Sequence, residues 1–148
     1  MSRHECQSSP AFRVVWPLED LRSITAKPKH RTAVVLWVEN AGDFERCLLA
    51  TGLAIRLAES GAKLFALVGK ESEQAHDALD WVLEEAGAED VVTTWHDQDD
   101  PGDVASFVVA SARASGLTLV VAALDGSTEP GARLRDAVAE AVSVDVGG

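Results

Sequence analysis

The sequence is poor in the residues that stabilise secreted domains or hold structural metals. Its 148 residues include two cysteines, one methionine and no tyrosine. Cys6 lies in a polar segment and Cys47 in an apolar helical pattern, so they form neither a disulfide framework nor a metal-ligand motif. No apolar run approaches the ~20 residues that span a bilayer, and no secretory signal is visible. We therefore expect a reduced, cytoplasmic protein without a membrane segment.

Lysine and arginine are missing from a long stretch of the chain. The net charge is −11, and residues 71–112 contain twelve aspartates and glutamates but no lysine or arginine. Because nucleic-acid binding needs cationic side chains that replace phosphate counterions, this surface argues against a nucleic-acid partner. The acidic stretch is either a solvated face that keeps the protein soluble or a docking face for a basic protein. Residues 1–31 have the opposite balance, with six basic and three acidic residues.

Familiar catalytic and cofactor motifs are also absent. A dinucleotide fingerprint needs three glycines in the turn after the first buried strand, and only Gly42 is present there. The segment Gly69-Lys70-Glu71-Ser72 is similar to the end of a phosphate loop, but position 64, where that loop needs a glycine, is leucine. No Gly-x-Ser-x-Gly elbow presents a nucleophilic serine. These absences favour a non-enzymatic protein.

What the sequence does contain is an alternation of apolar strands and amphipathic helices. Apolar runs typical of buried strands begin near residues 33, 64, 91 and 117, and a helical pattern follows each one. Connections of this length impose right-handed parallel crossovers. We predict a single three-layer α/β/α domain over residues 31–148, with a mostly parallel sheet of four to five strands. A flavodoxin-like order 2-1-3-4 of these four strands is favoured over a Rossmann-like order 3-2-1-4.

The two ends of the chain are expected to add to this domain. Residues 1–30 contain several prolines, which disfavour helix, and too many apolar side chains for a free tail. We predict that they form an extension that packs on the domain, with a strand near residues 12–16 and a helical turn at 18–23. Pro130 suits the first turn of the last helix, and residues 142–146 are a candidate for a short last strand.

The helix predicted over residues 43–60 has two apolar stripes. One stripe suits a helix that covers the sheet and consists of Phe44, Cys47, Leu48, Thr51, Ile55 and Ala58. The other consists of Leu49, Leu53 and Leu57, spaced four residues apart on roughly the opposite side. A helix that is apolar all round is buried on both sides, and a row of exposed leucines marks a contact surface. We therefore expect the leucine stripe to contact residues 1–30 or a second copy in a homodimer.

The acidic stretch supplies further candidate contact residues. Asp77, Asp80 and Glu84 carry the charge on the helix predicted over 71–86, and Trp81 lies at the edge of that helix's apolar stripe. A partly exposed tryptophan either caps the edge of a core or anchors a partner. The leading interpretation is a non-enzymatic module that binds a basic protein or its own copy through this acidic face and needs no cofactor.

Carboxylates at two strand ends define the alternative interpretation. Glu39 ends the first buried strand, Asp43 follows four residues later, and Asp97 and Asp99 leave the third strand as Asp-x-Asp. Carboxylates from neighbouring strand ends can form an oxygen-only Mg²⁺ site. This pattern resembles the Toprim domain of primases, topoisomerases and related nucleases. The resemblance implies an enzyme acting on a phosphorylated substrate, with Glu39 as general acid/base and Asp97 and Asp99 as metal ligands.

A simpler explanation of the same carboxylates is structural. Acidic residues at helix N-termini complement the helix dipole and cap free amides, and Asp43, Asp99, Asp100 and Asp103 suit that role. His96 stands beside Asp97, but adjacent residues leaving a strand point to opposite faces. We therefore expect His96 to be a loop histidine without a catalytic role.

Overall fold

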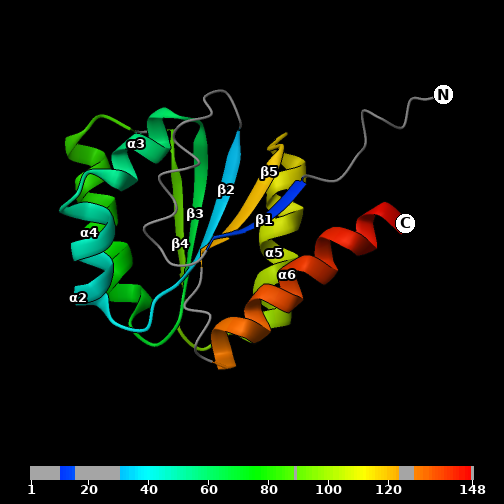
Figure 1. Cartoon of the computed structure of the whole chain (residues 1–148). Coiled ribbons are helices and arrows are strands. Elements are labelled where there is room, and N and C mark those ends of the chain that lie inside the picture. Colours follow the sequence, from blue (N-terminus) through cyan, green and yellow to red (C-terminus); the bar gives the residue numbers. More distant parts are fainter. Residues whose placement is uncertain (1–10, 16–30, 89, 124–128, 148) are drawn as a thin grey trace.

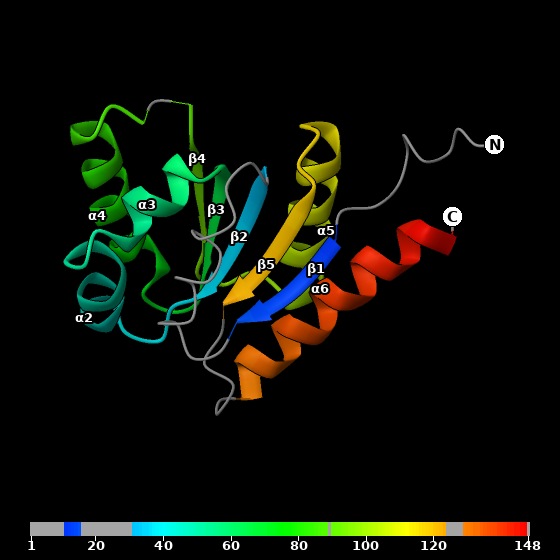
Figure 2. The same cartoon turned by 45° about the horizontal axis from the view of Figure 1, so that its top comes forward.

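Parallel strands form one sheet at the centre of the fold. The structure is a computed structural model that describes residues 11–15, 31–88, 90–123 and 129–147. Its strands are β1 (Ala11–Val15), β2 (Thr32–Trp37), β3 (Ala62–Val68), β4 (Val92–His96) and β5 (Leu119–Ala123). Every pairing among them is parallel, and the order across the sheet is β1-β5-β2-β3-β4 (Figure 2).

Helices cover both faces of the sheet (Figure 1). One face carries α2 (Ala41–Phe44), the π-helix η3 (Glu45–Leu49), α3 (Leu53–Glu59) and α4 (Ser72–Glu85). The other face carries α5 (Pro101–Ala114) and α6 (Glu129–Gly147). Because side chains alternate along a strand, each central strand supplies both cores. In β2, Val34 and Leu36 belong to the core beneath α4, and Ala33 and Val35 to the core beneath α5. The predicted three-layer α/β/α sandwich is confirmed.

The strand order corrects one detail of the prediction. Without β1, the remaining four strands are arranged 3-2-1-4 in order of sequence, which is the Rossmann-like order and not the flavodoxin-like order that we favoured. The chain proceeds from β2 through β3 to β4 in one direction, and α5 then crosses the opposite face to bring β5 back beside β2. As a result, β3 separates β2 from β4.

The predictions for the chain ends have mixed outcomes. The strand expected near residues 12–16 is confirmed as β1, which pairs with β5. The helical turn expected at 18–23 lies outside the described residues. The strand expected at 142–146 is wrong, because α6 continues to Gly147 and Val142 packs on the same core as Val138, one turn earlier. In the described part of the chain, no helix combines the length and apolarity needed to cross a membrane.

The helix predicted over residues 43–60 is not continuous. Its second turn is the π-helix η3, in which the amide of Ala50 donates to the carbonyl of Glu45, five residues earlier (2.8 Å). Gly52 then adopts a left-handed conformation (φ 77°) and α3 begins at the next residue. The wider π turn and this break change the direction in which all later side chains of the segment point.

This change of direction overturns the predicted leucine stripe. Leu53 and Leu57 are buried in the core, with 2% and 1% of their surface exposed, and Leu49 is half-buried. Thr51, which we assigned to the inward stripe, is exposed. The leucines therefore stabilise this layer of the fold and leave no apolar row at the surface. The homodimer that we predicted through this helix loses the surface on which it depended.

Candidate functional site

The predicted magnesium site is not assembled. The prediction required Glu39 to meet Asp97 and Asp99 at neighbouring strand ends, but β3 lies between β2 and β4. Two strand spacings amount to roughly 9–10 Å, about twice the separation expected of carboxylates that share one cation. Across the described residues, no three His, Cys, Asp or Glu side chains come close enough together to hold a metal ion.

The carboxylates near the strand ends instead have local partners. Glu39 accepts a hydrogen bond from the indole nitrogen of Trp37 (2.9 Å). Asp100 caps α5 by accepting from the amide of Gly102 (2.9 Å), as the helix-cap explanation predicted. The carboxylate of Asp99 accepts a hydrogen bond from Nδ1 of His96 (2.8 Å). These contacts organise the loops that follow β2 and β4.

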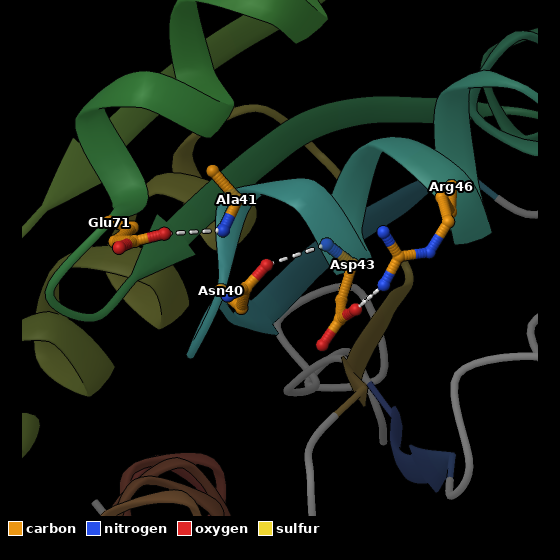
Figure 3. A network of polar contacts seen from close by, with 5 residues as sticks. All are labelled: Asn40, Ala41, Asp43, Arg46 and Glu71. Carbon is orange, nitrogen blue, oxygen red and sulfur yellow. Dashed lines mark hydrogen bonds and ion pairs between the residues drawn. The ribbon is translucent and has the colours of Figure 1, made fainter.

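A network of polar contacts closes the start of α2 (Figure 3). The side chain of Asn40 accepts from the amide of Asp43 (2.9 Å), and the carboxylate of Glu71 accepts from the amide of Ala41 (2.7 Å). Asp43 also forms an ion pair with Arg46 one turn later. Glu71 comes from the loop after β3, so it joins two neighbouring strand ends. The chain's own carboxylate thus occupies the helix start where an external anion would otherwise bind.

Backbone geometry explains why a glycine stands at position 69, without a phosphate-binding role for this loop. It follows β3 with φ 128°, and a Cβ at this position would lie 2.4 Å from the carbonyl oxygen of Val38. Its amide donates to the carbonyl of His96 (3.0 Å). Position 69 therefore requires glycine, since the loop passes closely between the ends of β2 and β4.

His96 is held more firmly than the sequence indicated. It is the last residue of β4, its Nδ1 lies 2.8 Å from Asp99 and its Nε2 lies 3.0 Å from the hydroxyl of Thr94. The imidazole also packs against the ring of Phe107 on α5, with 5.4 Å between the ring centres. The carboxylate that contacts His96 is thus Asp99 and not the adjacent Asp97. These contacts attach the loop after β4 to the strand and to α5.

The acidic residues of α4 form one continuous line, which we call the acidic ridge: Glu73, Asp77, Asp80 and Glu84. They are spaced four, three and four residues apart, so they share one side of the helix, and all four are exposed. Asp80 accepts from the hydroxyl of Thr93 (2.9 Å), which shows that the ridge runs alongside β4. Three of the four residues were predicted as contacts. Glu73 was missed, although the same helical spacing identifies it.

Trp81 lies on a different side of α4 from the acidic ridge. It lines a groove of about 680 Å³ between α4 and η3, together with Arg46 and Leu49. With 64% of its surface exposed, it is at the surface as predicted. Because it points toward η3, Trp81 and the acidic ridge form two separate surfaces.

The edge strand β4 completes the acidic side of the molecule. It pairs with β3 on one side, and no described strand pairs with its other side. Trp95 is 39% exposed and Val92 is 57% exposed, which is unusual for a strand of a three-layer sandwich. Trp95 packs against His76 of α4, with ring centres 6.5 Å apart. An exposed tryptophan therefore lies between the acidic ridge and the open edge.

The α5 side of this edge is also acidic and apolar. Phe107 of α5 is 41% exposed and packs against His96 at the margin of the sheet. Asp103 lies one helical turn before Phe107 on α5 and is exposed. Before the start of β4, Asp90 forms an ion pair with Lys63. Negative charge therefore flanks β4 on both faces of the sheet.

Comparison with known families finds a match over most of the chain. A model described as a domain of unknown function, DUF7684, matches residues 15–141, which is most of the chain. A comparison with curated proteins finds no match.

Proposed function

We propose that this chain, which belongs to the DUF7684 family, is a non-enzymatic binding module that holds a basic partner protein on its α4–β4 side. The observation that carries the proposal is the position of the acidic ridge beside an open sheet edge with an exposed tryptophan. The magnesium-dependent alternative is not proposed, because its three carboxylates are not brought together.

The charge of the ridge is not neutralised within the described part of the chain. Asp77 contacts the imidazole of His76 (3.3 Å) and Asp80 contacts a threonine hydroxyl, but no described lysine or arginine pairs with any ridge carboxylate. A surface of one sign produces a potential that attracts an oppositely charged partner and raises its association rate. Exposed carboxylates of this kind are available to lysine and arginine side chains of a partner.

Trp95 adds an apolar contact to the charged ones. Binding interfaces concentrate their energy in a few aromatic or arginine side chains surrounded by polar residues. An exposed indole also attracts a lysine or arginine through its π face, with a contribution of about 0.5–1 kcal/mol. Trp95 lies beside the ridge, so one basic segment can contact both.

The proposal is tested with a labelled ten-residue peptide of alternating lysine and valine, whose binding is followed by fluorescence anisotropy. Asp77→Lys/Glu84→Lys should weaken binding about tenfold, equivalent to about 1.4 kcal/mol, and flatten its dependence on salt. The control Glu59→Lys/Glu140→Lys makes the same change of net charge on other helices, and should change the affinity less than twofold. Equal effects of the two variants, or no binding to the wild-type protein, would overturn the proposal.

A further inference from the structure

We infer that the basic partner binds as an added β-strand, pairing with the open edge of β4. This inference rests on the proposed function and specifies the form in which the partner binds. A strand edge with unpaired backbone groups is a template for another chain, and peptide-binding domains use such edges to hold extended segments.

The backbone of β4 presents the necessary groups. The carbonyl of His96 accepts from Gly69 on the β3 side, so the amides and carbonyls of Val92, Thr94 and His96 point toward β3. Because the direction alternates along a strand, those of Thr93 and Trp95 point outward. In the described part of the chain, no residue pairs with these outward groups. An added strand would form hydrogen bonds to both residues.

The side chains of an added strand would meet acidic residues on both faces. On the α4 face, where Thr93 contacts Asp80 and Trp95 contacts His76, they would reach the acidic ridge. On the α5 face they would lie near Phe107 and Asp103. Every second side chain of an extended segment projects to the same face. Lysines or arginines at alternate positions would therefore be placed next to the ridge as a set.

The same charges select against a second copy of this chain at the edge. Antiparallel pairing of two β4 strands would bring two acidic ridges together on one face, and like charges repel each other across an interface. A basic extended segment has no such penalty. The occupant that the structure favours is therefore a lysine- or arginine-rich strand from another protein.

The test uses two N-methylated versions of the lysine–valine peptide, one methylated at the lysine amides and the other at the valine amides. In an added strand, one of these two sets points toward β4 and the other toward solvent. We expect one version to lose at least tenfold in affinity and the other to bind like the parent peptide. Side chains and charge are identical in the two versions, so they serve as controls for each other.

Hydrogen exchange provides a second measurement on the wild-type protein. The parent peptide should slow exchange of the Thr93 and Trp95 amides at least tenfold, while the Thr94 and His96 amides, which already face β3, should change little. Charge-dependent binding with equal affinity for both methylated versions, or equal loss in both, would overturn the added strand and leave the proposed function standing. Absence of charge-dependent binding by the parent peptide would overturn the proposed function itself.

Discussion

At the scale of single residues, the partner of each carboxylate depends on backbone geometry that spacing alone does not reveal. The sequence correctly indicated that Asp100 caps a helix, since an acidic residue directly before Pro101 and Gly102 is a local signal. It did not indicate that Glu71 reaches Ala41, thirty residues away, or that Asp99 returns to His96. The Glu71–Ala41 contact forms only after β2 and β3 have been aligned in the sheet, and the Asp99–His96 contact depends on the conformation of the loop after β4.

Asp90 gives a prediction at this scale that concerns pH. The ammonium group of Lys63 donates a hydrogen bond to its carboxylate and attracts its charge, which lowers the pKa of Asp90 below its ordinary value. A carboxyl whose pKa is lowered in the folded state stabilises that state above its unfolded pKa, and this contribution is lost as the pH falls through the folded pKa. An NMR titration should show the low pKa in the wild-type protein.

Two lysine variants test whether Lys63 causes the low pKa of Asp90. Lys63→Met should raise the pKa of Asp90 toward its ordinary value, and it should remove part of the stability difference between neutral and acidic pH. Lys70→Met, which removes an exposed lysine with no described acidic partner, should leave the Asp90 titration unchanged. An unchanged titration in Lys63→Met would show that this ion pair does not form in solution.

At the scale of elements, periodicity is a reliable guide while the helix is regular. The pattern of α4 predicted both its buried side, with Ala75, Leu79 and Leu83, and the exposed acids opposite it. The same reasoning failed over residues 43–60 because it assumed one continuous helix. Gly52 offers a signal of the break, since glycine is the residue that adopts positive φ most easily. The π turn of η3 has no comparable signal in the residues that form it.

The break in the helix predicts that alanine substitutions at two leucines will have very different costs in the free energy of unfolding. A regular helix would place these two leucines on the same side and give them similar costs. Leu57→Ala should cost about 2–4 kcal/mol in the free energy of unfolding, because the side chain is buried and its removal leaves a cavity. Leu49→Ala should cost about 1 kcal/mol, because that side chain is only half-buried beside the groove of Trp81. Urea denaturation of both variants measures the difference. Equal and small costs would indicate the continuous helix with an exposed leucine stripe.

At the scale of the whole molecule, the strand order determines which of the candidate residues lie close together. The number and type of the main elements follow from local patterns, and the sequence predicted them well. Which strands are neighbours depends on how each crossover packs, and both usual orders satisfy the same local patterns. The order found here separates Glu39 from Asp97 and places β4 at an edge. The acidic stretch without lysine or arginine was visible in the sequence, but the open edge of β4 and the exposed Trp95 beside it were not.

The uneven charge also predicts how the stability of the folded protein responds to salt. The chain carries a net charge of −11, and its ridge carboxylates repel one another without basic partners in the described residues. Raising sodium chloride from about 10 to about 150 mM shortens the Debye length from roughly 30 Å to roughly 8 Å. This screening should stabilise the fold by about 1 kcal/mol, which is a rise of a few degrees in Tm.

The two charge variants show whether the ridge is responsible for this response. Asp77→Lys/Glu84→Lys should raise Tm at low salt and reduce its salt dependence, because it inserts cations among the ridge carboxylates. Glu59→Lys/Glu140→Lys also places one lysine near a helix C-terminus and one within a helix, so the dipole and net-charge effects are matched. The ridge variant should therefore show a larger rise in Tm at low salt than the control variant. A salt response of equal size in both variants would mean that repulsion is spread over the whole surface. The ridge would then have no special electrostatic role in the unbound protein.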